Sequence, residues 1–207
     1  IQDSIVAADD AELVKAVLTG QVPGDGFVNV AVTADGNLAV SNNSSGLAIA
    51  QGLVTGATFV HKFGKAPDFD TGDGFVTVWD GANDAGINLM QYVYSTTADI
   101  DRISSTSASD TFAVEIQGLD ANYAMVTQTK TLTGTTPVAL TTPLLRVFRM
   151  KNIGSVNNVG RVFCFKNVAT TGGIPNTAAN VRAVMQPGNN QTLMAIYTIP
   201  AGYTGYM

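Results

Sequence analysis

Leu144-Leu145-Arg146-Val147-Phe148-Arg149-Met150 opens the apolar last third of a 207-residue chain, residues 143–207. Side chains of a β-strand point to alternate faces, so a run of this kind can bury one face or both. Residues 160–165 and 193–199 alternate in the same way. We therefore predict strands at these three places, and we expect them to form the core pair of sheets.

The middle of the chain carries further strand signals. Each candidate is bounded by Gly, Pro, Asn or Asp, which favour turns. The candidates are residues 75–79, 89–94, 112–117 and 123–132. Strands of this kind, without a second helical pattern, indicate an all-β fold of the β-sandwich or jelly-roll type. The chain is long enough to bury the core of one such domain.

One short helix is predicted near the N-terminus. Asp9 and Glu12 have the spacing of a capping box, and Gly20 ends the helix. An apolar stripe lies between these signals, formed by Leu13, Val14, Val17 and Leu18. A short amphipathic helix cannot bury its stripe alone, so it packs either on the sheet or against another chain.

A hairpin is predicted after this helix, because Asp35-Gly36 lies between two β-prone runs. Residues 47–64 are expected to continue as an interrupted strand. We therefore divide the chain into an N-terminal arm with the helix and the hairpin, residues 1–46, and a β-sandwich domain, residues 47–207.

The charge pattern excludes several partners. Charged residues make up 13% of the chain and the net charge is −5, and the largest basic grouping is Arg146, Arg149 and Lys151 inside a predicted strand. Nucleic acids attract clusters of Lys and Arg, so we expect no nucleic-acid binding. The sequence has no run of 18 apolar residues, so we expect no membrane-spanning helix and no membrane partner.

An aspartate-rich loop is the best metal candidate. Asp68, Asp70 and Asp73 lie close together beside Gly72 and Gly74, and calcium prefers closely spaced carboxylates. The spacing is not that of an EF-hand, and a plain acidic loop between strands is the favoured interpretation. We therefore assign no metal site and no cofactor, and keep calcium at this loop as the minority hypothesis.

No catalytic set is predicted. His61 is the one histidine and Cys164 the one cysteine. Cys164 lies in an alternating apolar stretch, where a free cysteine behaves as a small buried residue, and His61 is expected on the polar face of a strand. Aspartates beside glycines, as at Asp80-Gly81, are usual in turns, so a pair of catalytic carboxylates is not favoured either. A single cysteine also excludes an internal disulfide. We expect a protein that is not an enzyme.

Aromatic residues offer a possible sugar-stacking platform. Tyr92 and Tyr94 share a face of a predicted strand, Trp79 lies nearby in the sequence, and Tyr203 and Tyr206 end the chain. Core packing or a subunit contact is the commoner role for such side chains. Glycan binding stays as the alternative.

Three sets of short phrases in the sequence carry a resemblance to a known group of proteins. They are residues 45–50 with 61–64, residues 118–123 with 132–138, and residues 191–202. This combination resembles virion-associated proteins of tailed phages of marine bacteria, including cyanophages, and it spans nearly the whole chain. The resemblance implies a structural protein of the phage particle. It carries over no catalytic or ligand-binding residue.

The leading hypothesis is a decoration or cement protein on the exterior of the phage head. It would bind the major capsid protein or other virion proteins, and three-fold positions between capsomers would suit a homotrimer. One alternative is a receptor- or glycan-binding domain of a tail or head fibre, and another is a neck or tail component. The decoration hypothesis expects the aromatic residues to be buried. The fibre hypothesis expects them to line an exposed groove.

Overall fold

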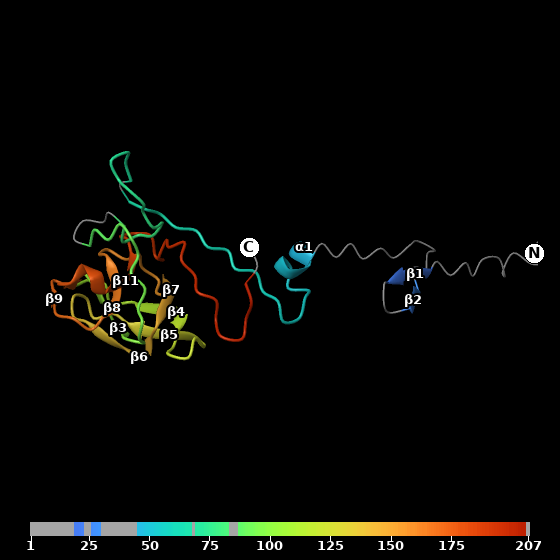
Figure 1. Ribbon diagram of the computed structural model, residues 1–207. Coiled ribbons are helices and arrows are strands. Elements are labelled where there is room, and N and C mark those ends of the chain that lie inside the picture. The colour runs from blue at the N-terminus through green and yellow to red at the C-terminus, as the bar shows by residue number, and fades with distance from the viewer. Residues whose placement is uncertain (1–18, 23–25, 30–44, 68, 83–86, 206–207) are drawn as a thin grey trace, which may run out of the picture. The chain divides into compact units, whose positions relative to one another are not determined.

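The structure is a computed structural model that describes residues 19–22, 26–29, 45–67, 69–82 and 87–205 (Figure 1). Its contacts divide the chain between Val60 and His61 into two compact units. The two units are therefore described separately. The predicted helix after Asp9 and the hairpin turn at Asp35-Gly36 both lie outside the described residues.

The first unit contains a hairpin and a short helix. Strand β1 (Thr19–Val22) pairs antiparallel with β2 (Gly26–Asn29), so Gly20 belongs to a strand and not to the end of a helix. Helix α1 spans Ser45–Ala50, where we expected a loop and then an interrupted strand. That prediction is wrong, because this stretch is rich in Ala and Leu, which favour a helix over a strand.

A glycine ends helix α1. Gly52 has a φ of +72°, and its N–H donates to the carbonyl of Ile49 at 2.9 Å. The N–H of Leu53 donates to the carbonyl of Ala48 at 2.8 Å. This pair of hydrogen bonds is the Schellman motif, which requires a left-handed residue that glycine adopts without steric cost.

The second unit, residues 61–207, holds the two larger sheets, both antiparallel (Figure 1). The four-stranded sheet has the order β11-β8-β3-β6, with bounds Val181–Met185, Val162–Lys166, Ile100–Ser105 and Val138–Leu144. The three-stranded sheet has the order β5-β4-β7, with bounds Met125–Thr131, Ala113–Leu119 and Arg146–Asn152. The described chain is therefore mostly β, which confirms the all-β class.

Two smaller elements lie between β8 and β11. Strands β9 (Thr170–Thr171) and β10 (Ile174–Pro175) form a hairpin, and a 3₁₀ helix, η1, spans Ala178–Asn180. The hydroxyl of Ser104 on β3 donates to the carbonyl of Gly173 at 2.7 Å, so the turn of this hairpin lies against the four-stranded sheet.

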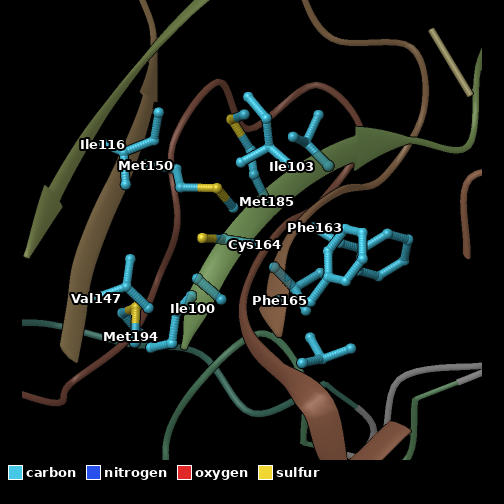
Figure 2. Close-up of a cluster of buried hydrophobic side chains, with 14 of the residues drawn as sticks. Ile100, Ile103, Ile116, Val147, Met150, Phe163, Cys164, Phe165, Met185 and Met194 are labelled. Carbon is cyan, nitrogen blue, oxygen red and sulfur yellow. The ribbon is translucent and has the colours of Figure 1, made fainter. Parts of the chain in front are cut away.

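Side chains of both sheets meet in one core (Figure 2). Ile116, Val147 and Met150 come from the three-stranded sheet, whereas Ile103, Cys164 and Met185 come from the four-stranded sheet; all six are at most 1% exposed. Every residue of β11 and four of the five residues of β8 are buried. These strands are therefore covered on both faces, which explains why their sequences are almost continuously apolar.

The strand predictions succeed where alternation is long. Residues 112–117 and 123–132 correspond to β4 and β5, and the opening heptapeptide and residues 160–165 overlap most of β7 and β8. The last third does not form the core sheet pair alone, because β3, β4, β5 and β6 precede it in sequence or begin before it.

Three strand predictions are wrong. Residues 75–79, 89–94 and 193–199 form no named strand. These residues make single interactions with other segments instead. An example is the isolated antiparallel bridge between Trp79 and Met194. A strand needs a partner along its whole length, and alternation in the sequence does not supply one.

Within the ranges that the structure describes, no helix has the length and apolar character needed to cross a bilayer.

Candidate functional site

One candidate surface lies on residues 61–67 and 69–80, which we call the apolar segment. At its start, the Lys62 ammonium donates to the carbonyl of Phe148 at 2.7 Å, and the N–H of Lys65 donates to the carbonyl of Leu193 at 3.2 Å. Between them, a Cβ on Gly64 would collide with the backbone of Val78 in the same segment and with that of Ala195 outside it. Only glycine therefore allows the segment to approach the rest of the unit this closely.

The other end of the apolar segment is fixed by Trp79 and Asp80. Trp79 is fully buried, and its indole N–H donates to the carbonyl of Leu89 at 3.2 Å. The Asp80 carboxylate accepts from the N–H of Leu193 at 2.6 Å, and its carbonyl accepts from the Gln186 amide at 3.0 Å. Both ends of the segment are thus attached to residues far away in the sequence.

Between these attachments the segment exposes large apolar side chains. Phe75 is 92% exposed, Phe69 63% and Phe63 55%, and Val78 is exposed as well. Phe69 and Val78, with Ala66 and Val76, line an open hollow of about 230 Å³. Large exposed apolar side chains beside an apolar hollow are typical of an interaction site.

The acidic loop lies within this segment, but its carboxylates are engaged locally. Asp70 accepts from the N–H of Gly72 at 2.7 Å, and the Asp73 carboxylate accepts from the N–H of Asp70 at 3.1 Å. Such contacts are those of a turn. Asp68, the third member of the calcium hypothesis, lies outside the described residues, and the described parts of the chain contain no group of three possible metal ligands.

His61 and Cys164 have different surroundings. His61 is exposed and its ring lies 6.0 Å from that of Phe63, whereas Cys164 is fully buried between the sheets (Figure 2). Burial raises the pKa of the Cys164 thiol to about 12, so the thiol is protonated at neutral pH. His61 does not lie in a strand, so that prediction is wrong. Cys164 is buried as the sequence indicated.

The predicted aromatic platform is divided between core and surface. Trp79 and Tyr92 are buried and meet edge to face at 5.0 Å between ring centroids. Tyr94 is 50% exposed and Tyr203 59% exposed, while Tyr206 lies outside the described residues. The exposure of these residues therefore does not decide between the decoration and fibre hypotheses.

A second candidate site surrounds Arg146, at the start of β7. The carbon at the centre of its guanidinium lies 5.2 Å from the ring centroid of Tyr94 and 5.9 Å from that of Tyr123. Both distances are within the range of cation–π interactions. We call these three residues the Arg146 cluster.

A second guanidinium lies behind this cluster. Nη1 of Arg146 donates to the carbonyl of Ser95, and Nε of Arg182 donates to the hydroxyl of the same serine at 2.9 Å. Arg182 is 3% exposed. Its pKa is lowered, mainly by burial, and the nearby charge of Arg146 acts in the same direction.

Sequence reasoning missed this cluster. It treated Arg146 as part of a weak basic grouping and Tyr123 as the start of a strand. The available signal was an arginine at the beginning of an otherwise apolar run, but nothing in the sequence places it beside Tyr94 and Tyr123. Tyr123 has a φ of +59°, which belongs to the turn that ends β4.

The chain matches no protein-family model, no curated protein and no solved structure. Its class is therefore stated from the structure itself: an antiparallel all-β protein whose described residues include an exposed apolar segment and a partly exposed arginine–tyrosine cluster.

Proposed function

We propose that this protein is a structural component of a phage particle, and that it acts as a capsid decoration or cement protein. The observation that carries the proposal is the apolar segment, which holds Phe63, Phe69 and Phe75 in solvent between two fixed ends. The sequence phrases that resemble virion-associated proteins support the same assignment.

Burial of these side chains would provide the binding energy. Moving one Phe side chain from water into a protein contact contributes about 1.5–3 kcal/mol. Phe75 is 92% exposed and would contribute near the upper end of this range. Because each bound subunit stabilises the assembled shell by mass action, a modest affinity repeated over many sites would strengthen the head.

Finer features of the architecture belong to the proposal as well. The two sheets form a β-sandwich or jelly roll, and residues 1–46 form an arm that reaches a neighbouring subunit. The protein is a homo-oligomer on the exterior of the head, with the major capsid protein as its partner. A homotrimer would suit a three-fold position between capsomers.

The copy number of the protein in purified particles tests this function. Quantitative mass spectrometry should give a simple fraction of the copy number of the major capsid protein. A few copies per particle would instead place the protein in the neck, the tail or a fibre. Absence from the particles would refute a virion role.

Substitutions test the apolar segment itself. Phe69→Ser with Phe75→Ser should abolish association with particles that lack the protein, because most of the apolar contact would be lost. Val159→Ser is the matched control, since Val159 is 64% exposed and lies outside the segment. Equal association of both variants would refute the assignment of the segment as the docking surface.

The second candidate function is recognition of a receptor or glycan by a fibre domain. The observation behind it is the Arg146 cluster, because a sugar ring can stack on a partly exposed tyrosine beside a guanidinium. Surface plasmon resonance against polysaccharide from the host surface would test it directly, and no response would remove this candidate.

A further inference from the structure

We propose that the Arg146 cluster binds the carboxylate of an acidic sugar, a uronate, and so gives the protein a glycan-binding site. This inference goes beyond the decoration function and does not depend on it. The site uses none of the exposed phenylalanines of the apolar segment.

The guanidinium of Arg146 has one free edge. Its Nη1 donates to the carbonyls of Ser95 and Leu145, and its Nε is buried without an acceptor. Nη2 has no acceptor among the described residues, and it is not among the buried unpaired atoms. Nη2 is therefore held in a fixed direction with its hydrogen atoms available to a ligand.

No described carboxylate neutralises this charge. The charge of Asp99 acts on Arg182, and the Asp99 carboxylate is paired with the Lys166 ammonium at 2.6 Å. Asp101 is likewise paired with Arg102, at 2.9 Å. Arg146 therefore forms no ion pair with a described carboxylate, and the guanidinium of the buried Arg182 adds positive charge behind it. Arginine binds carboxylates particularly well, because its planar group donates hydrogen bonds in a fixed geometry.

The two tyrosines complete a platform beside the free edge. Tyr94 is 50% exposed and Tyr123 40% exposed. Tyr94 packs against Tyr92 in an edge-to-face contact, with 5.0 Å between the two ring centroids. The carbonyl of Tyr123 accepts from the N–H of Ala201 at 2.9 Å, which fixes the turn that carries it.

This combination suits an acidic sugar better than a peptide. A sugar ring can place its C–H groups on a tyrosine face while its carboxylate reaches the adjacent guanidinium. Its hydroxyl groups can bond to the phenols of Tyr94 and Tyr123, which bond to no other described residue. A peptide carboxylate would also reach Arg146, but the exposed part of the cluster consists of tyrosine rings, on which a sugar ring can stack.

Isothermal titration calorimetry with the full chain tests the proposal. The probes are α-1,4-trigalacturonate, the neutral trisaccharide α-1,4-galactotriose, and hexaglutamate as an acidic peptide, all at the same ionic strength. We expect trigalacturonate to bind at least about tenfold more tightly than either of the other two probes. Equal binding of the charged and neutral sugars would overturn the role of Arg146, and tighter binding of hexaglutamate would overturn the assignment to a sugar.

Variants locate the site. Arg146→Lys keeps the positive charge but loses the planar donor pair, and Tyr94→Ala removes half of the platform. Each should weaken binding of trigalacturonate about tenfold or more. Lys151→Gln is the matched control, since Lys151 is an exposed cation on the same strand, and it should change the affinity less than about twofold.

The variants also separate binding from folding. Tyr94 is half exposed, so Tyr94→Ala decides the outcome if Arg146→Lys fails to fold. Unchanged binding in a folded Tyr94→Ala variant would show that the cluster only stabilises the fold. The copy number in particles does not enter this test, so the two proposals can fail independently.

Discussion

Asp110 provides the sharpest test of what holds the second unit together. It is 1% exposed and lies in the loop between β3 and β4. Its carboxylate accepts from the N–H of Val159 at 2.8 Å, the N–H of Gly160 at 2.9 Å and the hydroxyl of Ser105 at 2.5 Å. One side chain therefore connects β3 with the loop that precedes β8.

Replacing Asp110 with Ala should be strongly destabilising. Gly160 and Ser105 are buried, so their donors would lose their acceptor without gaining water. A buried unsatisfied donor costs about 1–3 kcal/mol, and the two together predict a loss of about 2–6 kcal/mol. Asp110→Asn keeps one acceptor oxygen and should lose about 1–2 kcal/mol.

Asp120→Ala is the matched control. Asp120 also accepts two backbone N–H groups, from Asn122 at 2.8 Å and Ala124 at 3.0 Å, but at an exposed turn. Water can replace its carboxylate, so its loss should cost about 1 kcal/mol or less.

Urea unfolding measures the difference. Trp79 is the one tryptophan and is fully buried, so its fluorescence reports unfolding of this unit. The midpoint of Asp110→Ala should fall far below that of Asp120→Ala at an unchanged slope. Equal midpoints for the two variants would refute the reasoning that burial of the donors sets the cost.

Two further predictions concern the same core. Gly172 and Gly173 both have positive φ, but a Cβ on Gly173 would collide with the carbonyl of Ser105, whereas Gly172 faces open space. Gly172→Ala should cost about 1–2 kcal/mol from backbone strain, and Gly173→Ala clearly more; similar thermal midpoints would contradict the packing of this turn. Cys164 should resist thiol reagents at pH 8 until the protein unfolds, and early labelling would refute its burial. Its pKa is raised from 9.0 to about 12, so the folded state holds the proton more tightly. Stability should therefore fall between pH 9 and pH 12 by up to about 1.4 kcal/mol per pH unit relative to Cys164→Ala.

Long alternating stretches could be predicted from the sequence. In each of the strands β4 and β5, one face is more buried than the other. The period of two is therefore visible in residues 112–117 and 123–132. The burial of Cys164 could be predicted for a similar reason, since its neighbours in sequence are all apolar.

Strand β3 could not be predicted in this way. Its sequence, Ile100-Asp101-Arg102-Ile103-Ser104-Ser105, has only two apolar residues, yet it lies between β8 and β6. Ser104 and Ser105 are buried because their hydroxyls donate to Gly173 and Asp110. These partners are supplied by other segments, so the local pattern does not reveal them.

The sequence alone determined the all-β class, the turns that bound the longest strands and the apolar surroundings of Cys164, because these depend on neighbouring residues. Only the tertiary structure decided that residues 193–199 receive a single bridge and form no strand. It also brought Arg146 between Tyr94 and Tyr123. The reason is physical: strand pairing and side-chain clusters require partners from distant parts of the chain, and periodicity within one segment carries no information about those partners.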